Sequence, residues 1–92
     1  MIKIRISGDF DKDYKELIKE NPDIKAEAAR KIILFSENPL DTRLKNHRLT
    51  KRLRNKWAFS IADDIRIIYE WKGKTTARFL AIGRHDKVYK KV

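Results

Sequence analysis

A short segment near the C-terminus collects side chains that can move protons and bind phosphate. Arg84, His85, Asp86 and Tyr89 supply a guanidinium, an imidazole, a carboxylate and a phenol within six positions. Imidazole titrates at about 6.5 and serves as acid or base near neutrality, and guanidinium binds phosphate oxygens in pairs. Gly83 precedes the segment. We expect it to let the chain leave a strand in a conformation that other residues rarely adopt.

Positive charge is concentrated in the part of the chain that carries these groups. The 92 residues hold 23 Lys and Arg against 13 Asp and Glu, a net charge of +10. Residues 1–40 sum to zero, with eight basic and eight acidic side chains, and residues 41–56 carry an excess of six. Clustered cations attract nucleic acid, so RNA is the first substrate to consider; a solvated surface or an acidic protein partner is the alternative. The cations predicted to bind RNA are Arg43, Lys45, Arg48, Lys51, Arg52, Arg54 and Lys56.

RNA cleavage without a metal has defined chemical requirements. A base takes the proton of the ribose 2′-hydroxyl, an acid protonates the leaving 5′-oxygen, and cations stabilise the charge on phosphorus. Arg66 and Arg84 suit the last task, and His47 and His85 suit proton transfer. Tyr89 can stack on a base or donate to the phosphate.

Most of these residues also have a structural alternative. His47 can be an ordinary surface residue of the basic loop, and Tyr89 can pack on the sheet edge as a C-terminal anchor. Arg66 can form an ion pair with Asp64 or Glu70 across a hairpin. His85 can pair with Asp86 at a strand end. The carboxylates that can orient a catalytic histidine are Asp63, Asp64 and Asp86.

The elements that must position these groups follow from apolar periodicity. Residues 2–6 alternate apolar and polar, as in a strand with one buried face. Apolar residues at helical spacing then predict a helix from about residue 10 to Asn21, capped by Ser7, Gly8 or Asp9. A second helix has Asn21 as its cap and Pro22 at its first position, and it ends at Asn38-Pro39. These two helices are expected to form an antiparallel pair.

The second half of the chain predicts a sheet. Residues 40–54 show no period and form a long basic connection. Alternation returns in 57–61 and 65–71, a hairpin that breaks at Asp63-Asp64. A strand over 76–82 is apolar on much of both faces and is therefore central.

The element order is β-α-α-β-β-β with a short tail. It predicts a single α+β domain over residues 1–92, an antiparallel-rich sheet covered on one face by a two-helix hairpin. The other face can stay open. The basic connection and the segment after Gly83 are then expected to line a shared concavity there.

Composition excludes several classes of protein. No apolar run approaches the roughly 20 residues that cross a bilayer, and the first residues lack a signal-peptide pattern, so we expect a cytoplasmic protein with no membrane partner. Without cysteine, and with two histidines, neither a disulfide nor a zinc site is expected. No cofactor motif is present, and we expect neither a metal nor a cofactor.

The element order, the Arg66-Ile67-Ile68-Tyr69 strand and the segment Ile82-Gly83-Arg84-His85-Asp86-Lys87-Val88-Tyr89 resemble the RelE/ParE toxin superfamily of type II toxin-antitoxin systems, closest to its RelE/YafQ-like mRNA interferase branch. The resemblance spans nearly the whole chain and implies the RelE/ParE-like microbial RNase fold. RNA-cleaving members act chiefly on mRNA in the ribosomal A site, and a small antitoxin wraps each of them. Members of the ParE branch instead poison DNA gyrase.

The resemblance also implies roles for individual residues. Arg66 matches the arginine implicated in phosphate stabilisation, and Arg84 and His85 fall at the catalytic position after the last strand. Tyr89 matches the aromatic residue near the C-terminus. His47 looks like the loop histidine of the YafQ-like branch.

An aspartate of that branch has its nearest match in Asp63 or Asp64. The chain departs from its relatives in strand 57–60, which has neither the lysine pair of RelE nor a second histidine. Ser60 or Ala58 stands where such a group would be.

The resemblance implies a toxin that is a ribosome-dependent mRNA endoribonuclease, with His85 as acid or base and His47 or an aspartate as its counterpart. Its expected partners are a cognate antitoxin, mRNA and the 70S ribosome, with DNA contacted only through the antitoxin complex. The alternatives are a ParE-like gyrase inhibitor without enzymatic activity, which would explain the missing lysines, and an inactive homologue that acts only in an antitoxin complex.

Overall fold

The computed structural model describes residues 1–91 of the chain. A five-stranded sheet has the strand order β1-β5-β4-β3-β2, in which β1 runs parallel to β5 and the other neighbours are antiparallel. This mixed sheet with its helices confirms the predicted α+β class. The elements are, in chain order, β1 (Lys3–Ile6), α1 (Gly8–Glu20), α2 (Ile24–Glu37), the 3-10 turn η1 (Thr42–Leu44), β2 (His47–Arg48), the 3-10 turn η2 (Lys51–Leu53), β3 (Trp57–Ala62), β4 (Ile65–Trp71), β5 (Thr76–Arg84) and α3 (His85–Lys91).

The two long helices begin and end close to the predicted positions. The Ser7 hydroxyl accepts a hydrogen bond from the Phe10 amide at 3.0 Å, which satisfies one free N–H at the start of α1. The prediction that α2 starts at Pro22 was wrong. Residues 21–23 form a turn, and the helix begins at Ile24. Asn38 ends it as expected.

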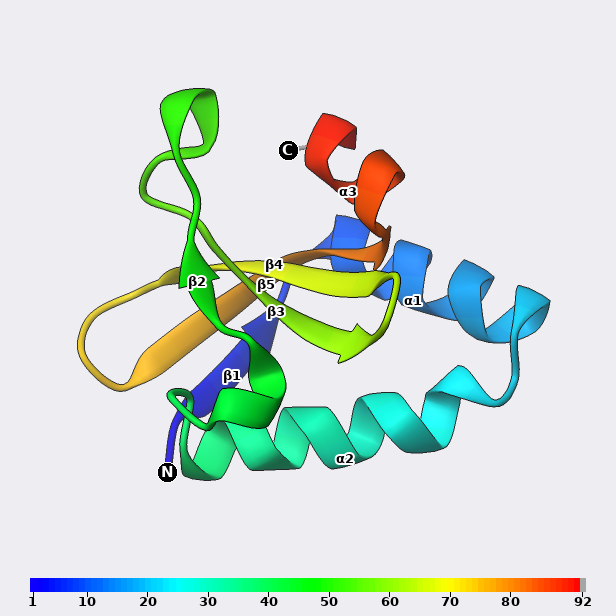
Figure 1. Cartoon of the computed structure of the whole chain (residues 1–92), viewed down its shortest axis with the longest axis horizontal. Helices are drawn as coiled ribbons and strands as arrows, with labels where there is room; N and C mark the ends of the chain where they lie inside the picture. The colour runs from blue at the N-terminus through cyan, green and yellow to red at the C-terminus, as the bar shows by residue number, and fades with distance from the viewer. Residues whose placement is uncertain (92) are drawn as a thin grey trace.

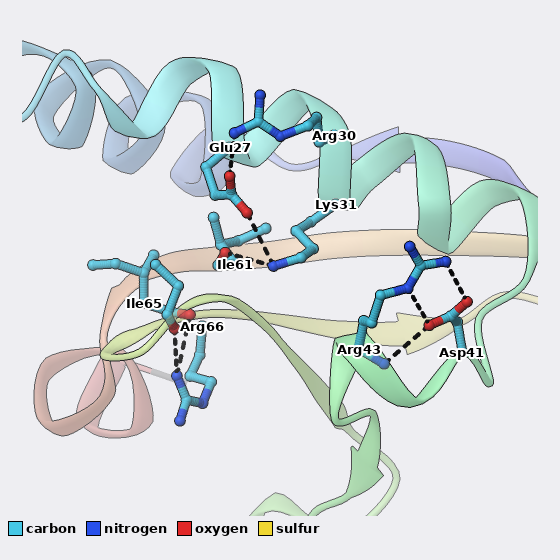
Figure 2. Close-up of polar contacts among 9 residues, drawn as sticks. Glu27, Arg30, Lys31, Asp41, Arg43, Ile61, Ile65 and Arg66 are labelled. Carbon is cyan, nitrogen blue, oxygen red and sulfur yellow. Dashed lines mark hydrogen bonds and ion pairs between the residues drawn. The ribbon is translucent and has the colours of Figure 1, made fainter.

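Both helices pack on one face of the sheet around Phe35. Its ring stacks on Phe59 of β3 at 4.6 Å and meets the edge of Tyr69 of β4 at 4.9 Å. Lys31 of α2 donates a hydrogen bond of 3.2 Å to the carbonyl oxygen of Ile61 (Figure 2). Aromatic packing and this hydrogen bond hold α2 against β3 and β4.

The opposite face of the sheet is only partly open, which corrects the expectation of an open face. In Figure 1, α2 and α3 lie on opposite sides of the sheet. Val88 of α3 is buried in a second, smaller cluster on this side. The other buried members of the cluster are Leu49, Leu53, Ala58, Ile68 and Ala81. The basic connection and the C-terminal segment therefore share an apolar contact on one sheet face, since Leu49 and Leu53 come from that connection.

Two segments have more regular structure than predicted. The basic connection contains the two-residue strand β2 and two 3-10 turns, and the expected tail after β5 forms α3. Ile6 is also 53% exposed although the period-2 pattern predicted a buried face. No helix within residues 1–91 is long and apolar enough to span a membrane.

Gly83 does not leave the strand in an unusual conformation, so that prediction was wrong. It lies inside β5, which continues through Arg84, and its φ is outside the left-handed range. A Cβ added to Gly83 would meet no atom within 4 Å.

Gly83→Ala is therefore expected to leave the protein equally stable or to stabilise it by about 0.5–1 kcal/mol, because alanine loses less backbone entropy in a strand. Urea unfolding of both proteins measures the difference. A destabilisation above about 1 kcal/mol would contradict the open space at this position.

Candidate active site

Arg66 lies on the sheet face that carries α3. It stands opposite Ser60 of β3 on one side and Gly83 of β5 on the other. Cross-strand partners point to the same face and alternate residues share a face, so Arg66 belongs with Ile68, whose side chain packs in the cluster under Val88. Because both of these cross-strand partners are small, the half-buried arginine has no large side chain directly beside it on β3 or β5.

His47 reaches the same face from the edge strand. It stands opposite Ala58 in β3, and Ala58 stands opposite Ile68 in β4. Strands about 4.8 Å apart and residues about 3.4 Å apart along a strand place the backbones of His47 and Arg66 about 12 Å from each other.

The Arg66 guanidinium is held by the turn between β3 and β4. Its Nη1 donates to the carbonyl oxygens of Asp63 and Ala62 at 2.9 and 3.1 Å. It also donates to the carbonyl oxygen of Ile65 at 3.3 Å (Figure 2). The alternative of an ion pair with Asp64 or Glu70 is not realised. Glu70 instead pairs with Lys72, which follows β4, and with Arg78 of β5. Anchoring through one nitrogen leaves the other guanidinium N–H groups available to an oxyanion.

His85 and Tyr89 form one face of α3. The His85 amide donates to the carbonyl oxygen of Asp64 at 2.9 Å, which fixes the start of the helix at the β3–β4 turn. One helical turn later, the Tyr89 ring meets the His85 imidazole edge-on at 4.6 Å. Burial raises the pKa of Tyr89 and the charge of Arg66 partly offsets this effect, so the phenol and the guanidinium share one region.

Arg84 and Asp64 form an exposed ion pair beside this group. Their closest nitrogen and oxygen atoms are 3.5 Å apart, and both side chains are about 60% exposed. The Asp64 carboxylate, one of three predicted as able to orient a histidine, therefore contacts an arginine. An exposed pair of this length is weak, and a phosphate can replace the carboxylate at Arg84.

His47 is exposed, and its ring orientation is set by a backbone oxygen. Its Nδ1 lies 2.9 Å from the carbonyl oxygen of Lys45. A carbonyl only accepts hydrogen bonds, so Nδ1 carries the proton and the neutral ring has its lone pair on Nε2. This tautomer suits His47 to the role of a base. Within residues 1–90, no hydrogen bond or ring contact joins His47 to His85.

The seven predicted RNA-binding cations differ in their surroundings. Arg43 binds both carboxylate oxygens of Asp41 at 3.0 and 2.9 Å, and these bonds lower the pKa of Asp41 to about 2. Arg52 donates to the carbonyl oxygen of Tyr89 at 2.5 Å and so ties η2 to α3. Lys56 is half-buried. The other four cations, Lys45, Arg48, Lys51 and Arg54, are exposed.

Asn46 was not predicted as a functional residue. Its side-chain oxygen accepts a hydrogen bond of 2.8 Å from the Tyr69 hydroxyl, and its side-chain nitrogen donates to Pro39. Tyr69 is fully buried, and burial raises the pKa of its hydroxyl to about 12. A buried tyrosine usually has a hydrogen-bond partner for its hydroxyl. The tyrosine at an apolar position of the strand was therefore the sequence signal for such a partner.

Stability is expected to fall between pH 10 and pH 12. The folded state holds the Tyr69 proton more tightly than the unfolded chain, so this contribution is complete below pH 10 and disappears as pH rises through the folded pKa of about 12. Urea unfolding at pH 9, 10, 11 and 12 measures the decline. In Tyr69→Phe the decline is shallower, and an identical decline in both proteins would rule out Tyr69 as its source.

A family model connects this geometry with known proteins. The model described as "Bacterial toxin of type II toxin-antitoxin system, YafQ" matches residues 2–90. The chain belongs to the YafQ toxin family. This confirms the predicted toxin superfamily and its YafQ-like branch, and it makes the protein a toxin of the type II class.

Solved structures of similar proteins agree with this membership. YafQ from E. coli is 25% identical with a TM-score of 0.76, and the match covers 94% of this chain and 96% of that one. The E. coli DinJ-YafQ complex matches with 26% identity, a TM-score of 0.70 and the same coverage. A metal-bound toxin from Helicobacter pylori is 30% identical, with a TM-score of 0.73 and coverage of 95% and 98%. No curated protein matches the chain.

The predicted site residues gather on the sheet face that carries α3. Arg66, His85 and Tyr89 come together there, Arg84 and Asp64 pair beside them, and His47 faces them from β2. Within residues 1–91, no three His, Asp or Glu side chains group as metal ligands. The catalytic roles of these residues stay predictions.

Proposed function

We propose that this YafQ-family toxin is a ribosome-dependent mRNA endoribonuclease that uses acid-base catalysis by its own side chains. The observation that carries the proposal is the arrangement on one sheet face. A turn-anchored arginine, Arg66, lies between an exposed histidine on α3 and a second exposed histidine on β2. Metal-free cleavage of RNA uses a base, an acid and a cation close to the reacting phosphate.

The tautomer of His47 supports a division of the two proton transfers. Nε2 of His47 takes the proton of the ribose 2′-hydroxyl, and the 2′-oxygen attacks the adjacent phosphorus. His85 donates a proton to the departing 5′-oxygen. The products are a 2′,3′-cyclic phosphate, which can open to a 3′-phosphate, and a 5′-hydroxyl.

Arginine and aromatic groups support the transition state in this proposal. Arg66 binds the non-bridging oxygens through the N–H groups that the turn does not use, and Arg84 adds a second guanidinium once phosphate displaces Asp64. In the free toxin, the ion pair with Asp64 keeps Arg84 beside the site. Tyr89 places the nucleotide next to His85.

The basic connection is proposed to bind ribosomal RNA. Its exposed cations offer charge without base selectivity, so most of the affinity comes from the ribosome and free RNA is cleaved slowly. Arg52 has a second role because it joins η2 to α3 and keeps the basic surface beside His85.

A cognate antitoxin is the proposed protein partner. The E. coli relative has been solved as a complex of DinJ and YafQ, and a chain with a net charge of +10 suits an acidic partner segment. DNA is contacted only through that complex. Translating ribosomes place the protein in the cytoplasm.

Controlled expression in bacteria without the antitoxin tests this function. The wild-type chain is expected to stop growth, and His85→Ala is expected to relieve the arrest at equal soluble protein. Purified toxin should leave the supercoiling activity of gyrase unchanged. Inhibition of gyrase with intact cellular mRNA would favour the gyrase-inhibitor alternative.

A further inference from the structure

Asn46 connects the segment that carries His47 to the buried core. Its amide group bridges the carbonyl oxygen of Pro39 and the hydroxyl of Tyr69, with both hydrogen bonds 2.8 Å long. Tyr69 cannot shift easily, because its side chain is fully buried and its ring lies 4.9 Å from Phe35 and 5.5 Å from Trp71. The backbone next to His47 is therefore fixed to the aromatic core.

The residues before Asn46 are fixed as well. Leu44 is fully buried in the main core. Lys45 has a left-handed backbone with φ 50° and ψ 39°, a conformation that L-residues with side chains avoid. This conformation directs the Lys45 carbonyl oxygen toward Nδ1 of His47 at 2.9 Å. A strained conformation persists only where surrounding contacts determine it, and Leu44 and Asn46 provide those contacts.

We propose that Asn46 and Tyr69 are positioning residues for His47. Their hydrogen bond holds the left-handed turn at Lys45, the turn places its carbonyl oxygen on Nδ1, and Nε2 is left as the acceptor that faces the substrate. This inference rests on the proposed nuclease function for its catalytic consequence. It assigns Tyr69 a role on the helix-covered face of the sheet, whereas Arg66 of the same strand faces the substrate.

Tyr69→Phe is the most selective test because it removes one oxygen and keeps the ring in the aromatic core. Without the hydroxyl, Asn46 loses its buried donor and the turn can relax. Misplacement of a catalytic group by about 1 Å can cost up to about 10²-fold in rate, so we expect kcat for RNA cleavage to fall about tenfold with KM unchanged. Asn46→Ala is expected to lower kcat at least as much.

A double-mutant cycle separates positioning from a general structural effect. In the His47→Ala background, Tyr69→Phe is expected to cause no further loss of kcat, because the two residues act through one group. Tyr14→Phe is the matched control. Tyr14 is half-buried on α1 and stacks on Phe10, away from this network, so kcat should not change.

Nitrogen NMR of the His47 imidazole gives a readout that needs no catalysis. The wild-type ring is expected to carry its proton on Nδ1, and both tautomers are expected in Tyr69→Phe and Asn46→Ala. An unchanged tautomer in both variants would overturn the inference, and so would an equal loss of kcat with and without His47. If the wild-type protein cleaves no RNA, the nuclease proposal fails, and the NMR result still decides whether the network orients His47.

Discussion

His85→Ala is expected to lower the rate constant of mRNA cleavage by about 10²–10⁴-fold, the usual contribution of one general acid or base. The imidazole is exposed at the start of α3, and its nearest aromatic contact is Tyr89. Removing it deletes the proposed donor to the 5′-oxygen and creates no cavity in a core. Stability should therefore change by no more than about 0.5 kcal/mol. Single-turnover cleavage of mRNA on ribosomes measures the rate constant.

Lys87→Ala provides a control on the same helix. Lys87 is also exposed and lies outside the proposed catalytic group, so its replacement should leave the rate constant within about threefold of the wild type. Equal rates for the wild type and His85→Ala would remove His85 from the chemistry. A matched loss in Lys87→Ala would indicate a binding effect of α3.

Arg66→Ala is expected to lower the same rate constant by about 10²–10³-fold, since one preorganised donor to a developing oxyanion contributes about this much. Arg66→Lys should recover only part of the loss, because an ammonium group cannot donate to the turn and to a phosphate in the fork geometry of arginine. Cleavage at saturating ribosome concentration measures both variants. Urea unfolding of each variant corrects for the three hydrogen bonds to the β3–β4 turn.

Arg78→Ala is the matched control for Arg66. Arg78 is also a half-buried arginine of the sheet, but it pairs with Glu70 at the other end of the strands. Its replacement should leave cleavage unchanged. A similar loss in Arg78→Ala and Arg66→Ala would point to overall charge and would contradict a specific role at the phosphate.

The sequence predicted the elements in which apolar residues recur at regular spacing or which end at a residue that breaks a helix or strand. The hairpin of β3 and β4 has apolar residues at every second position and breaks at Asp63-Asp64. Ser7 caps the start of α1, and Asn38 ends α2. The elements that were missed are short. β2 has two residues and α3 has seven, which is too few to show a period, and both depend on burial of Leu49 and Val88.

The candidate site was predictable only in part, for a similar reason. Arg66 could be placed on one face from alternation. His85 and Tyr89 were recognised by residue type within one short segment, but the helix that brings their rings together was not predicted. Contacts between distant segments carry no local pattern. The Asn46–Tyr69 hydrogen bond joins residues 23 positions apart, and the Arg84–Asp64 pair joins residues 20 positions apart. Neither contact could therefore be predicted from the local sequence.

Primer extension on an mRNA in a translation extract measures directly whether this toxin cleaves translated mRNA. The wild-type toxin is expected to produce new 5′ ends within translated sequence, and these ends should disappear when translation initiation is blocked. They should also disappear in the double variant His85→Ala with Arg66→Ala, while Arg78→Ala keeps them. Unchanged cleavage by the double variant would exclude catalysis by His85 and Arg66. No cleavage by the wild type in an extract whose translation it arrests would exclude an mRNA endoribonuclease.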